Sequence, residues 1–163
     1  RFQLEDPHRY VLELVAAAVR AGSTAIHVRN DSDDFEIRWD GKAPSAEHLD
    51  YLFDHIFSRD EGDTARSLQH LAQGVFGALG LKPRWVHVER PGARYDLTDP
   101  LEPTRTGCER TEGVFLHVRE RFGWNVVREF MNPLHASQET RLLERDAWTS
   151  PVPVVVSRFE FSV

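Results

Sequence analysis

Apolar residues along this chain switch between a helical and a strand spacing, and this alternation constrains the fold more than any other feature. From residue 7 to residue 21 the spacing is i, i+3, i+4, i+7, i+8, the period of an amphipathic helix. The positions are Val11, Leu14, Val15, Ala18 and Val19. Residues 25–29 and 35–39 instead alternate apolar and polar side chains around a turn-forming cluster at 30–34. They predict a β-hairpin with one face on the helix.

Two further helices are expected in the next forty residues. One begins at Ser45, ends near Ser58 and has an apolar face of Leu49, Leu52, Phe53, Ile56 and Phe57. A charged, glycine-containing loop at 59–63 separates it from the other, which ends before Gly80. The apolar face of this second helix consists of Leu68, Leu71, Val75, Phe76 and Leu79.

The remaining chain returns to strand periodicity. Residues 85–90 and 94–97 predict a second hairpin, residues 98–112 a long surface loop, and residues 114–119 a strand. Helices are expected at 124–131 and 138–148, and a last strand at 152–161. A sheet with one apolar face needs a covering layer of helices. The pattern therefore predicts a two-layer α/β (α+β) sandwich, with a mixed, mainly antiparallel sheet covered on one face.

Composition indicates one globular domain over residues 1–163, with 40% hydrophobic and 28% charged residues. The net charge of −6 argues against nucleic acid as a partner, and no apolar run is long enough to cross a membrane. Cys108 is the only cysteine, so a cytoplasmic location is expected. Because the chain starts at Arg1 and ends in a strand-like segment, we expect a fragment of a longer protein, with other domains of that polypeptide or another protein as partners.

Three segments, in order, resemble the motifs of the GHKL superfamily of ATPase domains, which includes gyrase, mismatch-repair ATPases, sensor histidine kinases and the ninety-kilodalton heat-shock chaperone. Residues 12–28, LELVAAAVRAGSTAIHV, are similar to the first motif, residues 35–53 to the second, and residues 57–81 to the third. The later strands are similar to those of bacterial chaperone-like members. The resemblance implies the helix-on-sheet sandwich called the Bergerat fold.

Several motif positions carry residues that cannot do the family's chemistry. Ala17 stands where the resemblance implies an Asn ligand of Mg²⁺, although Mg²⁺ needs oxygen donors. Trp39 stands where an Asp accepts the adenine amino group, and Asp40 is one residue away, which on a strand points to the other face. The general-base position is kept as Glu13. The remaining positions of the degenerate nucleotide pocket are Arg20, Gly41, Ala72, Gly74 and Gly77.

Each of these residues also has a structural interpretation. Glu13 also fits a solvated helix charge. Arg20 could bind a phosphate, but it is expected to pair with an acidic neighbour such as Glu13 or Asp40. Gly41, Gly74 and Gly77 fit turn or helix-packing roles, and Trp39 fits a space-filling core role. No grouping of residues in the sequence predicts a metal site.

The sequence leads to two main hypotheses of function, from different classes, and to a third, less favoured one. The first is a pseudo-ATPase that acts as a regulatory or protein-interaction module in a larger protein and needs no cofactor. The alternative is a divergent ATPase that binds ATP and Mg²⁺, with Asp40 on adenine and Glu13 on water. A DNA-processing subunit is the third, and the acidic composition argues against it.

Overall fold

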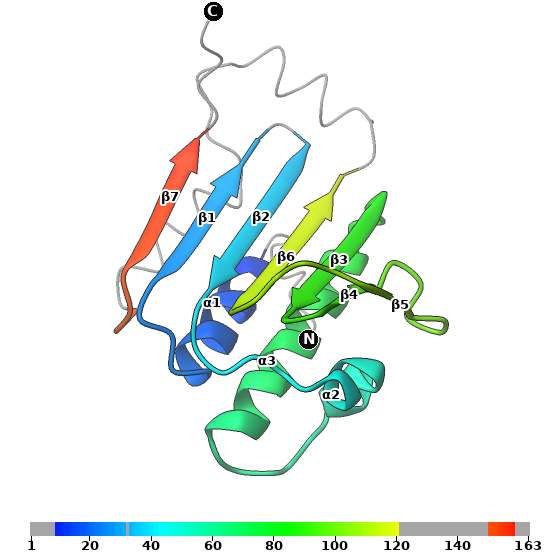
Figure 1. The fold of residues 1–163 in the computed structure, drawn as a ribbon, viewed down its shortest axis with the longest axis horizontal. Helices are drawn as coiled ribbons and strands as arrows, with labels where there is room; N and C mark the ends of the chain where they lie inside the picture. The colour runs from blue at the N-terminus through cyan, green and yellow to red at the C-terminus, as the bar shows by residue number, and fades with distance from the viewer. Residues whose placement is uncertain (1–8, 32, 121–149, 159–163) are drawn as a thin grey trace, which may run out of the picture.

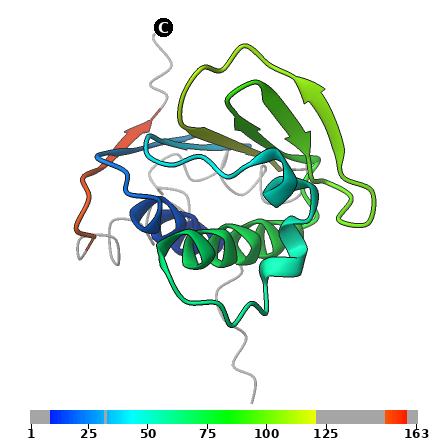
Figure 2. The same ribbon diagram turned by 60° about the horizontal axis from the view of Figure 1, so that its bottom comes forward.

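The described part of the chain folds into one seven-stranded sheet with helices on one face (Figures 1 and 2). The structure, a computed structural model, describes residues 9–31, 33–120 and 150–158. The helices are α1 (Tyr10–Arg20), α2 (Ala46–Asp50), the 3-10 helix η1 (Leu52–His55) and α3 (Asp63–Leu79). The strands are β1 (Ile26–Asn30), β2 (Asp34–Trp39), β3 (Trp85–Arg90), β4 (Ala93–Asp96), β5 (Thr104–Gly107), β6 (Val114–Arg119) and β7 (Val154–Arg158).

The sheet has the order β5-β4-β3-β6-β2-β1-β7, and among these described strands only the pairing of β1 with β7 is parallel. Helices α1 and α3 lie side by side against one face, as Figure 2 shows. This is the predicted two-layer sandwich with a mixed, mainly antiparallel sheet. Both predicted hairpins, β1–β2 and β3–β4, are confirmed. No helix among the described residues is long and apolar enough to cross a membrane.

The core lies between the helices and the inner face of the sheet. Every second residue of the central strands is buried, as the alternation in the sequence predicts. Helix α1 contributes Val11, Leu14 and Ala18, which are completely buried. Full burial of one such Val or Leu side chain stabilises the fold by roughly 1.5–3 kcal/mol.

The segment after β2 differs in detail from the prediction. Ser45 does cap a helix, because its hydroxyl oxygen accepts a hydrogen bond from the His48 N–H at 3.1 Å. That helix ends at Asp50, however, and the chain continues as η1 after Tyr51 leaves helical geometry at φ −119°. The break turns Phe57 outward, where it is 89% exposed. Its predicted place on a continuous apolar face is therefore wrong.

Two other expectations are corrected by the structure. Phe76 is exposed because α3 turns Leu71, Ala72 and Val75 toward the core, and Phe76 lies one residue around the helix from that face. The predicted loop at 98–112 contains the strand β5, whose four residues are all exposed at the edge of the sheet and show no apolar alternation. The predicted helices at 124–131 and 138–148 lie outside the described residues. Of the predicted last strand, Val154–Arg158 is described as β7.

Candidate functional site

A cavity of about 600 Å³ opens where the end of α1, the start of α3 and the segment between β2 and α2 meet. That volume is within the range of small-molecule sites. Its apolar wall includes Trp39, Ala43, Leu68 and Leu71. Its polar wall includes Arg20, Lys42, His48, Asp63, Thr64, Ser67 and Arg90.

Gly41 allows the chain to form one side of this cavity. Its φ of +96° lies in a region that side chains rarely adopt, and a Cβ atom there would come within 2.7 Å of the Ala21 carbonyl oxygen. The same carbonyl accepts a hydrogen bond from the Lys42 N–H at 2.9 Å. The Ser23 hydroxyl donates a second bond to the Asp40 carbonyl oxygen at 2.6 Å. The loop after β2 is thus held against the turn after α1.

Cationic side chains surround the cavity, and each has a partner. Arg20 forms an ion pair with Asp63 at 3.3 Å, which joins the end of α1 to the start of α3. Arg20 therefore pairs with an acidic neighbour as expected, but the partner is Asp63 and not Glu13 or Asp40. The Lys42 ammonium donates to the Thr64 hydroxyl at 3.4 Å. Arg90 Nε donates to the Pro44 carbonyl oxygen at 2.8 Å.

Two solved structures are similar to this chain. The Aquifex aeolicus MutL ATPase domain complexed with ADP has a TM-score of 0.57 and 16% identity, over 96% of this chain and 61% of that chain. The N-terminal domain of a DNA repair protein has a TM-score of 0.52 and 15% identity, over 87% of this chain and 43% of that chain. The chain therefore shares its fold with these two domains.

At the level of sequence, no protein-family model and no curated protein matches the chain. This chain spans less than two thirds of the length of either structural neighbour. Identities this low show a shared fold, and function depends on the residues placed in the site.

Trp39 and Ala17, where the sequence resemblance implies oxygen ligands, are both buried. Trp39 is 4% exposed, and its side chain forms part of the cavity wall and of the core. Ala17 is completely buried, and its carbonyl oxygen accepts a hydrogen bond from the Ser67 hydroxyl at 2.8 Å. Neither side chain offers an oxygen atom to a ligand.

Asp40 does not line the cavity. Its carboxylate accepts hydrogen bonds from the Thr24 hydroxyl, from the Thr24 N–H at 2.8 Å and from the Ala25 N–H at 3.2 Å. These bonds, led by those from Thr24, lower the pKa of Asp40 from its ordinary value of 3.8. The Asp40 carboxylate therefore organises the turn before β1, and the geometry gives no support to the expected contact with adenine.

Glu13 lies between the two long helices. Its carboxylate is 2.7 Å from His70 Nδ1 on α3, and it is not among the residues that line the cavity. The geometry gives Glu13 a role in joining α1 to α3, while the expectation that it activates water has no contact to support it.

The predicted pocket positions Ala72, Gly74 and Gly77 lie in the second half of α3. A Cβ atom on Gly74 would come within 2.7 Å of Leu14 Cδ2, and one on Gly77 within 3.0 Å of Tyr10 Cβ. These glycines allow α1 and α3 to pack closely, so the helix-packing interpretation fits them and close contact with phosphates does not.

Several cavity residues were missed by the sequence reasoning. Lys42, Asp63, Thr64 and Arg90 line the cavity but were not among the predicted pocket residues. Gly62, with φ +113°, directly precedes α3 and marks the true start of that helix. Placing the helix start there would have predicted Asp63 and Thr64 beside the first-motif residues.

Proposed function

We propose that this domain is a GHKL-type pseudo-ATPase that acts as a regulatory or protein-interaction module within a larger protein. One observation carries the proposal. Among the described residues that line the cavity, Asp63 has the only carboxylate, and that carboxylate is paired with Arg20. The cavity therefore keeps the walls of a ligand site while offering little to a divalent cation.

The donor set does not fit Mg²⁺. Magnesium requires near-octahedral coordination by oxygen atoms and is held through carboxylates together with substrate phosphates. Ala17 supplies no oxygen from its side chain, and its carbonyl oxygen is already bonded to Ser67. Three cations, Arg20, Lys42 and Arg90, further oppose a bound metal ion. No catalytic step through Mg²⁺ follows from these residues.

The adenine side of the cavity supports the same proposal. A purine amino group buried without an acceptor costs roughly 1–3 kcal/mol. Trp39 has only a donor, its indole N–H. The nearby carboxylate of Asp40 is occupied by Thr24 and Ala25.

The wider context of the proposal rests on the size of the domain. Both structural neighbours are longer than this chain, so we place the domain within a larger polypeptide whose other domains, or a separate protein, are its partners. A cytoplasmic location is part of the proposal, because Cys108 is the only cysteine.

A divergent ATP-binding domain is the second candidate. It is favoured by the cavity volume of about 600 Å³ and by the three cationic side chains, which suit phosphates. Because Asp40 and Glu13 lie outside the cavity, this candidate would have to bind nucleotide through Lys42, Arg90 and the first turn of α3.

A titration with ATP, with and without Mg²⁺, tests the proposal by thermal shift and calorimetry. We expect no stabilisation that depends on Mg²⁺. A ligand at 100 times its Kd would stabilise the domain by about 2.7 kcal/mol, which is readily detected. The Aquifex aeolicus MutL ATPase domain, which has been solved with ADP, serves as the positive control. Saturable, Mg²⁺-dependent ATP binding to this chain would refute the pseudo-ATPase proposal.

A further inference from the structure

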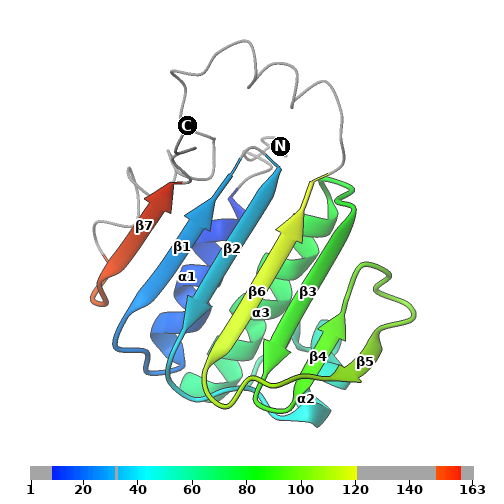
Figure 3. The same ribbon diagram turned by 45° about the horizontal axis from the view of Figure 1, so that its top comes forward.

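The outer face of the sheet, opposite the helices, carries a continuous row of charged and aromatic side chains. Figure 3 shows the strands of this face, with the helices behind them. Strand pairing places His27 opposite Arg38, Arg38 opposite Phe115, and Phe115 opposite Glu89. Side chains directly opposite one another on one face lie roughly 4.5–5.5 Å apart at Cβ. The row therefore crosses four neighbouring strands, β1, β2, β6 and β3.

Two adjoining hollows follow this row. One, of about 320 Å³, is lined by His27, Arg29, Glu36, Arg38, Arg110 and Phe115, together with the backbone of neighbouring residues. The other, of about 340 Å³, includes His27, Arg38, Arg110 and Glu112. Because three residues belong to both, the hollows form one elongated groove, which we call the Arg38 groove. It is separate from the cavity at the helix ends, with which it shares only Trp39 among the described lining residues.

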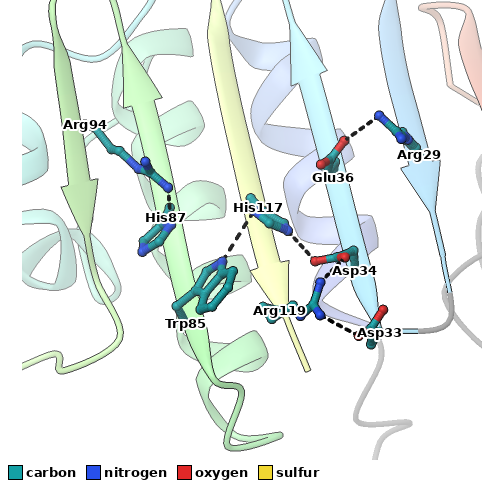
Figure 4. Close-up of polar contacts among 9 residues, drawn as sticks. All are labelled: Arg29, Asp33, Asp34, Glu36, Trp85, His87, Arg94, His117 and Arg119. Atoms are coloured by element: carbon teal, nitrogen blue, oxygen red, sulfur yellow. Dashed lines mark hydrogen bonds and ion pairs between the residues drawn. The ribbon is translucent and has the colours of Figure 1, made fainter. Parts of the chain in front are cut away.

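Among the described residues, Arg38 is the cation of this groove for which no partner is found. It is exposed, and its guanidinium forms no hydrogen bond or ion pair with another described residue. Elsewhere on the outer face the arginines are paired. Arg119 bonds Asp33 and Asp34, and Arg29 lies 3.7 Å from Glu36, as Figure 4 shows. The Arg38 guanidinium thus lies on a surface where the neighbouring arginines form ion pairs with carboxylates.

Arg110 presents a second, oriented guanidinium beside Arg38. Its Nε lies 3.3 Å from Glu89, and its guanidinium carbon lies 5.0 Å from the centre of the Phe115 ring. An arginine held in this way keeps donors available at its terminal nitrogens. Two guanidinium groups and the Phe115 ring therefore converge on one groove.

The charge pattern selects the kind of ligand. Glu36 and Glu112 interrupt the cations, and the whole chain carries a net charge of −6. A uniform polyanion such as nucleic acid would meet repulsion along this groove, whereas separate carboxylates can each meet one guanidinium. In an extended peptide, alternate residues point to the same side, about 6.6–6.8 Å apart.

We infer that the Arg38 groove binds an extended acidic peptide segment of a partner protein, with carboxylates bound by Arg38 and Arg110 and with contact to Phe115. The inference names a surface for the interaction role proposed above, on which it rests, but it does not depend on whether the helix-end cavity binds nucleotide.

Fluorescence anisotropy at low ionic strength tests the inference, with a labelled peptide of alternating serine and glutamate as the probe. A peptide with glutamine in place of glutamate is the matched control. We expect saturable binding of the glutamate peptide only, and a loss of affinity of about tenfold in Arg38→Gln, because a hydrogen bond between charged groups is removed. Arg110→Gln should weaken binding as well.

Arg59→Gln is the matched control variant, since Arg59 is exposed on the loop before α3 and far from the groove in sequence. It removes the same charge and should leave the affinity unchanged. Thermal melts of all three variants report whether the fold is kept. Equal loss in Arg59→Gln, no saturable binding, or equal binding of the glutamine peptide would overturn the inference.

Two further probes separate other ligands and the proposed function. In competition experiments, inorganic phosphate, single-stranded DNA and unlabelled glutamate peptide are each added to displace the labelled peptide. If phosphate or DNA displaces it at a lower concentration than the unlabelled peptide does, the groove binds another anion and the inference is overturned. If the domain binds both ATP with Mg²⁺ and the glutamate peptide, only the pseudo-ATPase proposal is refuted. If it binds neither, only the inference of peptide binding in the Arg38 groove is refuted.

Discussion

Gly41 is the residue whose conformation most directly shapes the helix-end cavity. Its φ of +96° and its approach to the Ala21 carbonyl are independent reasons for glycine. For Gly41→Ala we expect a loss of about 2–4 kcal/mol in the free energy of unfolding, since both backbone strain and a backbone clash are introduced. Urea denaturation measures this loss.

The variant Gly92→Ala separates the cost of backbone strain from the cost of the backbone clash. Gly92 also has positive φ, +80°, but a Cβ atom there would meet nothing within 4 Å. That variant should lose only about 1–2 kcal/mol, the strain of the left-handed region alone. Equal losses in the two variants would show that the contact between Gly41 and Ala21 does not contribute.

At the residue scale, the chemistry of a side chain can be judged from the sequence, but its partners cannot. Ala17 and Trp39 have no side-chain oxygen whatever their surroundings, so residue type alone excludes them as oxygen ligands. The ion pair of Arg20 with Asp63 joins positions 43 residues apart in sequence, and only the packing of α1 on α3 determines it. Asp40 illustrates the same limit, because its bonds to Thr24 and Ala25 depend on how two turns meet.

At the element scale, α1 and α3 form the unit that carries the cavity. Their contact uses Gly74 and Gly77 for close approach and the Glu13–His70 pair at the margin. The Glu13 and His70 side chains are 40% and 28% exposed, so solvent weakens their interaction.

For Glu13→Gln we therefore expect a loss of less than about 1 kcal/mol in the free energy of unfolding, with no change in nucleotide binding. A double-mutant cycle with His70→Gln should return a coupling energy of the same small size. Denaturant titrations of the four proteins provide the measurement. A fall in ATP turnover in Glu13→Gln with the fold intact would instead indicate the general-base role.

Elements with a regular apolar period were predictable, and elements without one were not. Strands β1, β2, β3 and β6 alternate strictly because one face is buried against the helices. Strand β5 pairs with a single neighbour at the edge, so its TRTG sequence carries no such signal. The interruption at Tyr51 escaped prediction because the helical period continues through it, while the backbone geometry changes.

At the scale of the whole molecule, β7 connects the end of the described chain to its beginning. Val154–Arg158 pairs in parallel with Ile26–Asn30, and the Ile26 N–H donates to the Pro153 carbonyl oxygen at 2.9 Å. The hairpins were predictable from adjacent segments, whereas this pairing joins strands separated by most of the sequence. It places β1 inside the sheet and leaves β7 as the edge.

The contribution of β7 to the stability of the fold can be measured with two neighbouring valines of this strand. Val156 packs partly buried against the core, and its neighbour Val155 is 48% exposed on the opposite face. Val156→Ala should lower the free energy of unfolding by about 1–2 kcal/mol, because about two methyl groups leave an apolar environment. Val155→Ala should cost less than about 0.5 kcal/mol, as expected for a surface position. A shift of one residue in the pairing of β7 with β1 would exchange the faces to which the two valines point. Equal or reversed losses of stability would therefore contradict the observed parallel register of β7 on β1.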